Sequence, residues 1–310
     1  MQQSSRLWSV VLAGGDGARL SALTTSSDGD VVPKQYCSLG GGDLLLQRTV
    51  TRARSVCDTG RICAVVAAPH RRWWQQLDLG IEPPNLIVQP QNRGTGLGML
   101  LPVLHIARRD PSANVVFLPS DHHVANERVL TASMRDAAAL LEPEDAHQVV
   151  LLGIEPEDPD PELGYIVPAA RSRDGASHVA QFIEKPSVFE ARRAIAQGAL
   201  WNAFILVASV RTLLAVFNRK MPEAVAAMTA AIADDSGESL RELYAGSLML
   251  CDFSRDVMPG MEPLLRVLTV PRCGWTDLGT PRRVHSLAGR PHDARVKAAG
   301  MFPDLLARCG

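Results

Sequence analysis

Three glycines and an arginine near the amino terminus are the first residues whose spacing suits phosphate binding. Gly14, Gly15 and Gly17 directly follow the apolar run 10–13, and Arg19 comes two residues later. Glycines after a buried strand let the backbone approach a phosphate and direct its N–H groups at it, and arginine adds a bidentate donor. The segment matches neither a dinucleotide fingerprint nor a Walker loop, because the remaining residues of those motifs are missing. A tight turn that requires positive φ explains the glycines alone equally well.

A lysine follows this loop at a distance that allows it to reach a bound triphosphate. Lys34 comes after Pro33 and after a polar stretch, 21–30, whose composition is typical of a mobile loop. Most lysines are solvated surface groups, and Lys34 alone would be interpreted in that way. Its position after the glycine loop is what favours a role at the reacting phosphates.

Two aspartates lie after apolar runs, where they could bind one magnesium ion together. Asp121 follows the run 114–118, and Asp277 follows the run 264–270. Mg²⁺ prefers oxygen ligands and usually keeps one or two carboxylates besides phosphate oxygens. Each aspartate could instead cap the helix that follows it, as is common at strand-to-helix turns. The paired histidines after Asp121 have no third ligand at a suitable spacing, so zinc is a poor match.

A third polar group suits a sugar phosphate. Glu184 and Lys185 end one apolar run, and Asn202 opens the next. A carboxylate accepts hydrogen bonds from sugar hydroxyls, an amide both donates and accepts, and an ammonium neutralises a phosphate monoester. The alternative is an ordinary surface ion pair between Glu184 and Lys185.

Composition narrows the classes of protein that the chain can represent. Its 310 residues suffice for one large α/β domain or two smaller ones, and 46% apolar with 21% charged residues is typical of a globular protein. Thirty-two basic and thirty-three acidic residues produce no overall field that would attract nucleic acid or an anionic membrane. Six scattered cysteines without a Cys-x-x-Cys pair predict reduced thiols, and no apolar run reaches membrane-spanning length. We therefore expect a cytoplasmic protein.

The elements that must position these residues alternate along the chain. Apolar runs between segments of helical periodicity predict an α/β protein with a mostly parallel sheet, which binds ligands at the carboxyl ends of its strands. The predicted strands are 7–13, 62–67, 85–88, 114–118, 148–154, 178–183, 203–208 and 264–270. The predicted helices are 43–55, 96–108, 127–141, 188–197, 210–218 and 222–232. Residues 1–290 are expected to form the functional domain, and 291–310 a peripheral tail.

Taken in order, these segments resemble the sugar-1-phosphate nucleotidyltransferases, and most closely the mannose-1-phosphate guanylyltransferase branch. The resemblance spans roughly residues 7–284 and rests on Gly14-Gly15-x-Gly17-x-Arg19-Leu20, Pro33-Lys34-Gln35, Leu45-Leu46-Gln47-x-Thr49, Gln89-Pro90-x-x-Arg93-x-Thr95, Leu118-Pro119-Ser120-Asp121-His122, Gly164-Tyr165-Ile166, Phe182-Ile183-Glu184-Lys185-Pro186, Trp201-Asn202 and Trp275-x-Asp277-x-Gly279. Each motif alone is weakly specific, but the ordered set identifies the family.

The resemblance implies a three-layer α/β/α nucleotide-diphospho-sugar transferase fold and a Mg²⁺-dependent reaction between a nucleoside triphosphate and a sugar 1-phosphate. It assigns catalysis to Arg19, Lys34 and Asp121, and Mg²⁺ binding to Asp121 and Asp277. It assigns nucleotide binding to Ala13, Gly14, Gly15, Gly17, Gln89, Arg93, Thr95 and Ser120, and sugar phosphate binding to Gly164, Glu184, Lys185 and Asn202. No polymeric nucleic acid or membrane partner is implied, and a homo-oligomer is compatible with the sequence.

Several positions depart from the family pattern. Gly94 stands where the branch has asparagine, Phe204 where it has glycine, and Glu162-Leu163 where it has Gly-Tyr. These changes leave three functions open: guanylyl transfer to mannose 1-phosphate, the same chemistry with another base and sugar, and a non-catalytic module that binds nucleotide sugars.

Overall fold

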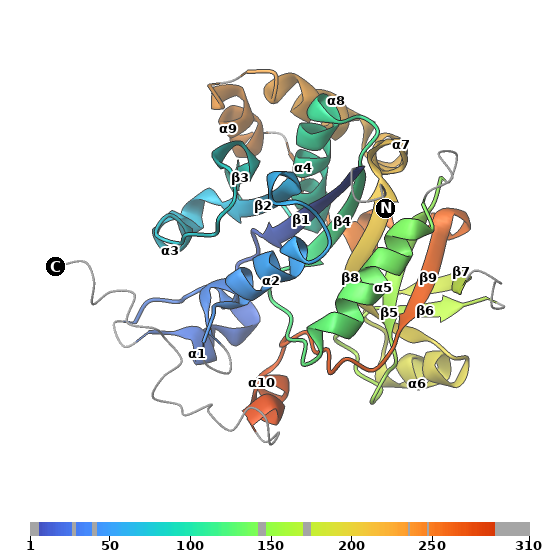
Figure 1. Ribbon diagram of the computed structural model, residues 1–310. Coiled ribbons are helices and arrows are strands. Elements are labelled where there is room, and N and C mark those ends of the chain that lie inside the picture. Colours follow the sequence, from blue (N-terminus) through green and yellow to red (C-terminus); the bar gives the residue numbers. More distant parts are fainter. Residues whose placement is uncertain are drawn as a thin grey trace.

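A single sheet contains the strands at whose carboxyl ends we expected the functional residues. In the computed structural model, which describes residues 6–26, 29–38, 42–141, 147–169, 175–234, 236–246 and 248–288, nine strands pair in the order β3-β2-β1-β4-β8-β5-β9-β7-β6. The first four of these pair in parallel: β3 (Leu86–Gln89), β2 (Ile62–Ala67), β1 (Leu7–Ala13) and β4 (Asn114–Pro119). Their carboxyl ends therefore meet at one edge of the sheet (Figure 1).

The second half of the sheet is joined to the first through a reversed strand. β8 (Leu200–Ser209) runs antiparallel to both β4 and β5 (Val149–Ile154), and β9 (Leu265–Val270) runs parallel to β5. β7 (Ala176–Ile183) pairs antiparallel with β9 and with β6 (Tyr165–Pro168), and β6 also pairs with β8. Among the described strands, β7 and β8 oppose the common direction, so the mostly parallel sheet that we predicted is confirmed.

Helices cover both faces because successive side chains of a strand point to opposite sides of the sheet. Val11 of β1 is buried on the face covered by α2 (Leu45–Arg54) and α5 (Glu127–Ala139). Val10 is buried on the opposite face, beneath α4 (Thr95–Arg109). Of the other helices, α6 (Val188–Ala196) packs on the first face, and α7 (Val210–Lys220), α8 (Pro222–Ala231) and α9 (Glu238–Ala245) pack on the second. The predicted three-layer α/β/α fold is thus confirmed (Figure 1).

The differences from the predicted elements concern short segments. β6 and α9 were not predicted, because four and eight residues are too few for a clear periodicity. β8 begins at Leu200 rather than at residue 203, since its first residues pair with β6. The short helices α1 (Ser21–Thr24), α3 (Arg71–Trp74) and α10 (Pro281–Ala288) were also missed.

Two further predictions concern the polar stretch 21–30 and the carboxyl-terminal segment 291–310. The polar stretch 21–30, predicted to be a mobile loop, contains α1 and forms a β-bridge between Thr25 and Val31. The predicted tail, 291–310, lies outside the described residues, so the domain boundary stays a prediction.

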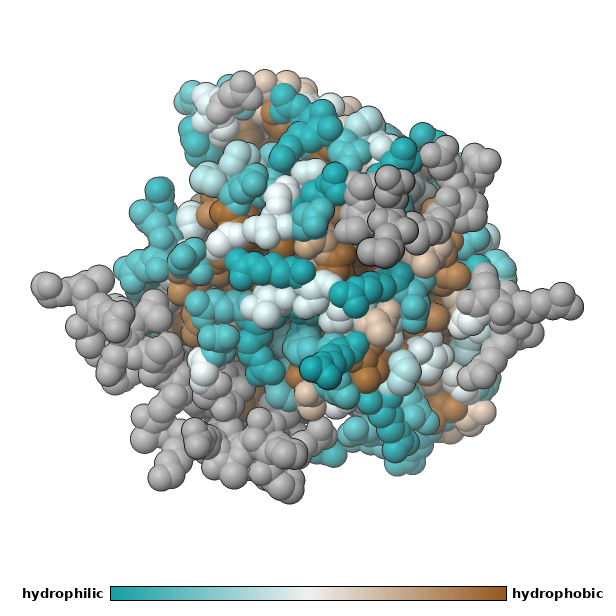
Figure 2. All heavy atoms as spheres, in the orientation of Figure 1, coloured by the Kyte–Doolittle hydropathy of each residue, from teal (hydrophilic) through white to brown (hydrophobic). Residues whose placement is uncertain are grey.

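The molecular surface is mixed in character. Within the described ranges, no helix is long and apolar enough to cross a membrane. Phe189, Met249 and Leu250 are exposed apolar side chains, and on the face drawn in Figure 2 hydrophobic residues lie interspersed among hydrophilic ones. This distribution does not identify a partner surface, and the homo-oligomer stays a prediction.

Candidate active site

A pocket of about 450 Å³ opens where the carboxyl ends of β1 and β4 face the second half of the sheet. This is the position at which open α/β sheets bind ligands. Most of the predicted site residues line it: Gly14, Gly15, Gly17, Arg19, Lys34, Gln89, Thr95, Ser120, Asp121, Gly164, Glu184, Lys185, Asn202 and Asp277. Residues from both halves of the chain thus converge on one space, although they lie up to 263 positions apart between Gly14 and Asp277.

Two predicted nucleotide-binding residues do not line this pocket. The carbonyl of Ala13 accepts a hydrogen bond from Gln35 Nε2 at 2.9 Å and so helps to shape the glycine loop. The guanidinium of Arg93 donates to the carbonyl of Tyr244, at 3.2 Å from Nε and 2.7 Å from one Nη. Arg93 therefore secures the end of α9 against the start of α4, and its direct role toward a nucleotide stays a prediction.

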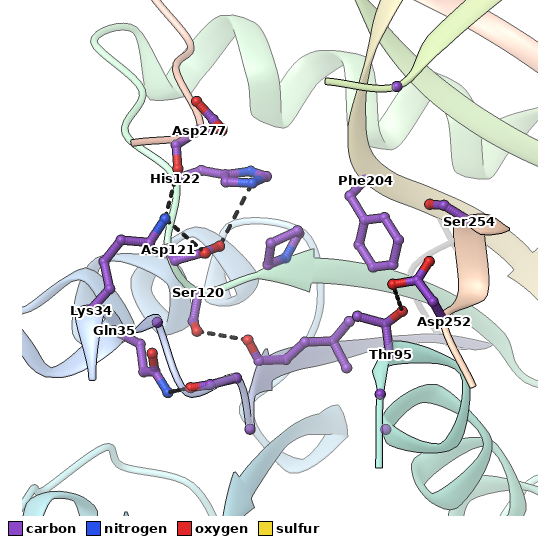
Figure 3. A pocket seen from close by; sticks show the side chains of 18 of the residues that line it. Lys34, Gln35, Thr95, Ser120, Asp121, His122, Phe204, Asp252, Ser254 and Asp277 are labelled. Atoms are coloured by element: carbon purple, nitrogen blue, oxygen red, sulfur yellow. Dashed lines mark hydrogen bonds and ion pairs between the residues drawn. The ribbon is translucent and has the colours of Figure 1, made fainter. Parts of the chain in front are cut away.

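Lys34 lies at the centre of the site and is buried. It opens a short 3₁₀ turn after Pro33, and its side chain is only 6% exposed. Its Nζ lies 2.9 Å from Asp121 Oδ2 and donates to the carbonyls of Asp277, at 2.9 Å, and Leu278, at 3.1 Å. Figure 3 shows the ammonium between the two aspartates. Lys34 is therefore a fixed charge that joins the end of β4 to the segment after β9.

The glycine loop packs directly against this lysine. A Cβ at Gly17 would lie 2.9 Å from the backbone nitrogen of Lys34, and Gly17 has φ of +64°. Gln35 Nε2 donates to the carbonyls of Ala13 and Gly15, the latter at 2.8 Å. Glycine is thus required at position 17 both for its conformation and for its close approach to the following turn.

Asp121 is held as an anion by its neighbours. Burial raises the pKa of its carboxyl, but the Lys34 ammonium opposes that effect, and the pKa lies below its usual value. His122 is itself buried, which lowers its pKa to about 4. Trp275 Nε1 donates to His122 Nδ1 at 3.2 Å, so the proton of the neutral ring resides on Nε2, 3.7 Å from Asp121 Oδ1. The aspartate therefore faces a neutral histidine and a charged lysine.

Asp277 is held in a different way. Its backbone carbonyl binds Lys34, while its carboxylate binds a guanidinium nitrogen of Arg283 in α10. In Figure 3 this carboxylate points away from Lys34 and Asp121. Arg283 also donates to Asp160 Oδ2 at 2.7 Å, and its guanidinium carbon lies 5.1 Å from the centre of the Trp201 ring. The two predicted metal ligands thus share a pocket, but the Asp277 carboxylate is bound to an arginine.

The side chains of the site can supply only part of the coordination shell of a metal ion. Among the described residues, no group of three or more His, Cys, Asp or Glu side chains could by itself hold a metal ion. Asp121 lines the pocket, and its ionised side chain is 39% exposed. One or two carboxylates are sufficient for Mg²⁺ when substrate phosphates complete the octahedron. The residues therefore fit a metal that is bound jointly with a phosphate ligand.

Arg19 meets a carboxylate across the mouth of the pocket. Its Nη1 lies 2.8 Å from Glu162 Oε2, and the two side chains are 57% and 47% exposed. Exposed pairs of this kind contribute little stability and are easily broken. Arg19 is thus available to exchange its partner for a phosphate group.

The residues expected to bind a sugar phosphate line the same pocket. A Cβ at Gly164 would lie 2.9 Å from Glu184 Oε2, so the backbone and this carboxylate are in close contact. Burial raises the pKa of Glu184, and Lys185, whose Nζ is 3.9 Å away, lowers it by less. Asn202 Oδ1 accepts from the backbone N–H of Phe204 at 3.0 Å. Lys185 and Phe204 have φ of +46° and +54°, which is unusual for residues other than glycine.

A sequence profile described as nucleotidyl transferase matches residues 8–289 of the chain. The chain belongs to the nucleotidyl transferase family. The mannose-1-phosphate guanylyltransferase of Escherichia coli K12 is 29% identical over 89% of the chain and 58% of its own length. The xanthan biosynthesis protein XanB of Xanthomonas campestris strain B100 is 28% identical over 87% of the chain and 57% of its own length. The chain thus spans a little over half the length of these relatives.

Solved structures support the same nucleotidyl transferase fold. A protein from Thermus thermophilus described as mannose-1-phosphate geranyltransferase is 29% identical, with a TM-score of 0.77, over 91% of this chain and 79% of its own. A UDP-glucose pyrophosphorylase complexed with UDP-glucose has a TM-score of 0.59 at 12% identity, covering 91% of this chain and 96% of its own, and it shows the fold alone. The family resemblance that the motifs indicated is therefore confirmed.

Some lining residues of this nucleotidyl transferase site were missed in the sequence. Asp252 accepts a hydrogen bond from Thr95 at 3.3 Å, and Ser254 lies two residues further along. Both belong to an irregular segment, and Phe253–Val257 forms a π-helical turn of the kind often found at functional sites. Gln35 was part of a quoted motif but received no role, although an amide next to Lys34 was a usable signal. No comparable local signal marks Asp252 or Ser254.

Proposed function

We propose that this protein is a sugar-1-phosphate nucleotidyltransferase, which joins a nucleoside triphosphate to a sugar 1-phosphate and releases pyrophosphate. Family membership supports the reaction class. The relatives that match most of the chain include four mannose-1-phosphate guanylyltransferases, which supports GTP and mannose 1-phosphate as the substrates. The five cysteines described are free thiols, in keeping with the expected cytoplasmic location.

The observation that carries this proposal is the contact between Lys34 and Asp121. These two residues, 2.9 Å apart, line the same pocket as the glycine loop, Glu184 and Asn202. A triphosphate on the loop and a sugar near Glu184 and Asn202 would then meet next to a fixed ammonium. This is the arrangement that a reaction between two anions needs, because alignment and charge neutralisation lower its barrier most.

In the proposed reaction an oxygen of the sugar phosphate attacks the α-phosphorus of the triphosphate. The new P–O bond forms as the bond between the α- and β-phosphates breaks, and its electron pair leaves with pyrophosphate. Lys34 would stabilise charge on the attacked phosphate, and Arg19 would leave Glu162 to bind the departing group. Lys185 would hold the attacking phosphate, while Glu184 and Asn202 orient the sugar hydroxyls.

We assign Mg²⁺ binding to Asp121 together with the phosphates, and to Asp277 once its carboxylate is released from Arg283. When bound, the ion would supply neutralisation of phosphate charge without a change of protonation. The low pKa of Asp121 keeps it ready to act as a ligand at neutral pH.

Pyrophosphate release tests the proposal. Purified protein is incubated with Mg²⁺ and each pairing of ATP, CTP, GTP and UTP with glucose 1-phosphate, galactose 1-phosphate and mannose 1-phosphate. We expect turnover with at least one pair, most rapidly with GTP and mannose 1-phosphate. Folded protein without turnover on any pair would contradict an enzymatic function for this chain.

A non-catalytic nucleotide-sugar binding module is the second candidate function, and Phe204 is the observation that favours it. Its aromatic ring lines the pocket beside Phe253, at 6.2 Å between ring centres, and occupies space in the expected sugar region. Thermal stabilisation by a nucleotide sugar without any pyrophosphate release would support this candidate.

A further inference from the structure

We propose that Arg283 is a positioning residue that makes divalent metal binding depend on the nucleotide. In the free protein Arg283 holds the Asp277 carboxylate away from Asp121. When a metal–triphosphate complex enters, Arg283 releases this carboxylate, which can then bind the metal. This inference rests on the proposed function, since it names the order in which that site takes its ligands.

The first support is the geometry around Asp277. Lys34 donates to the carbonyls of two successive peptides, those of Asp277 and Leu278, and Leu278 has φ of +52°. The backbone of Asp277 is therefore constrained, whereas its carboxylate can change direction by side-chain rotation alone. Arg283 holds the carboxylate in its present direction, facing away from Lys34 in Figure 3.

The second support is burial. The side chains of Asp277 and Arg283 are 12% and 13% exposed, and that of Asp160, the second carboxylate on Arg283, is 17% exposed. Trp201 covers the guanidinium from one side. The Arg283 guanidinium in contact with Asp277 repels a second cation strongly, because water is largely excluded there. Free Mg²⁺ should therefore bind weakly to the Asp277 carboxylate. A triphosphate carries enough negative charge to reverse that balance.

The third support is the contrast with neighbouring pairs on the same acidic loop. Arg282 pairs with Asp158 at 3.1 Å, and their side chains are 86% and 41% exposed. Arg272 pairs with Glu155 at 3.1 Å, with 87% and 59% exposed. Such exposed pairs contribute little. Arg283 differs from both arginines because its side chain is largely buried and because it binds a residue that lines the pocket. Arg282, the exposed arginine next to it in sequence, is therefore a matched control.

The test measures binding of Mn²⁺, a paramagnetic substitute for Mg²⁺, by electron paramagnetic resonance without any nucleotide. We expect Arg283→Gln to bind Mn²⁺ about tenfold more tightly than the wild type, because a positive charge is removed from the Asp277 carboxylate. Arg282→Gln should change the affinity by less than about twofold. Repeating the titration with GTP present should reduce the difference between Arg283→Gln and the wild type. Equal Mn²⁺ affinities of Arg283→Gln and the wild type without nucleotide would overturn the proposal.

Two further variants separate this role from a purely structural one. Arg283→Lys keeps the charge and should keep Mn²⁺ binding weak, even if its melting temperature falls. Asp160→Asn removes one of the carboxylates that bind Arg283, which strengthens the attraction between Arg283 and Asp277. This variant should therefore weaken Mn²⁺ binding, opposite in direction to Arg283→Gln. If Arg283→Gln does not fold, tight Mn²⁺ binding by Arg283→Lys or by Asp160→Asn would overturn the proposal instead. Failure of the proposed function is distinguishable, because it appears as absent turnover in the wild type whatever the metal affinities are.

Discussion

The ammonium of Lys34 lies 2.9 Å from the carboxylate of Asp121, and the same nitrogen donates to the carbonyl of Asp277 at 2.9 Å. One buried side chain thus connects two segments that are 156 residues apart, from Asp121 to Asp277. This connection joins the end of β4 to the segment after β9 at the same pocket, and the account of the reaction depends on it.

Lys34→Met should abolish most of the activity. The variant removes the fixed charge at the reacting phosphates, and loss of one such group typically costs about 10²- to 10³-fold in rate. It also leaves two backbone carbonyls without their donor, so the free energy of unfolding should fall by about 1–3 kcal/mol. Pyrophosphate release and thermal melting measure the two effects. Lys220→Met is the control and should retain activity, because this half-buried lysine lies outside the pocket and binds the carbonyl of Pro259. Full activity of Lys34→Met would remove Lys34 from the mechanism.

His122 should impose a pH dependence on stability. Its pKa falls from 6.5 to about 4 on folding, so between these values the unfolded chain binds the extra proton and the folded protein does not. Stability contributed by the neutral ring is therefore complete above pH 6.5 and is lost as the pH falls toward 4, by about 3 kcal/mol in total. Urea unfolding of the wild type and His122→Asn across this range measures the difference. Parallel curves for the two proteins would show that the buried histidine titrates normally.

Phe204→Gly should be more stable than Phe204→Ala. Both variants remove the ring, but only glycine adopts φ of +54° without strain, and the left-handed conformation costs other residues about 1–2 kcal/mol. At ordinary positions alanine is the more stable of the two, because it restricts the unfolded chain. The reversed order, measured by chemical denaturation, is thus diagnostic of strain at this position. Both variants should also accept bulkier sugar 1-phosphates than the wild type.

Gly17 and Gly15 should differ sharply in their tolerance of alanine. Gly17 has φ of +64°, and its Cβ would meet the backbone of Lys34, whereas nothing lies within 4 Å of a Cβ at Gly15. We expect Gly17→Ala to lose about 1–3 kcal/mol of stability and Gly15→Ala less than about 0.5 kcal/mol. Thermal melting checks this, and an equal loss in both variants would contradict the described loop geometry. Reduced activity of a normally stable Gly15→Ala would in turn indicate that substrate phosphates approach this glycine.

The sheet and its main ligand-binding edge were predictable because their signals are local. The run ending at Ala13 is followed by glycines, and the run ending near Pro119 is followed by Asp121, so each strand and its functional loop are contiguous in sequence. The family resemblance then placed Lys34 and Asp277 in the same site. Their shared pocket agrees with that expectation, whereas their individual roles await the experiments above.

The orientation of several side chains was not predictable, because distant partners decide it. Arg93 donates to Tyr244, 151 positions away, and Arg19 binds Glu162, 143 positions away. Arg283 is only six residues from Asp277, but Asp160 and Trp201 from other elements set its direction. Single-sequence patterns contain no information on such pairs.

Backbone strain was equally unpredictable from the sequence. Among the described residues, those other than glycine with positive φ are Lys185, Phe204 and Leu278. The first two line the pocket, and the third binds Lys34 through its carbonyl. Strained conformations gather at functional sites because the surrounding structure enforces them, and residue type alone does not reveal them.

The fate of the α-phosphate tests the central claim most directly. Protein is incubated with Mg²⁺ and mannose 1-phosphate, once with GTP labelled at the α-phosphate and once with GTP labelled at the γ-phosphate. The account predicts that the α-label appears in a nucleotide sugar and the γ-label in pyrophosphate, and that Lys34→Met suppresses both. Release of the γ-label as inorganic phosphate, or no transfer of the α-label to the sugar phosphate by folded wild-type protein, would contradict it.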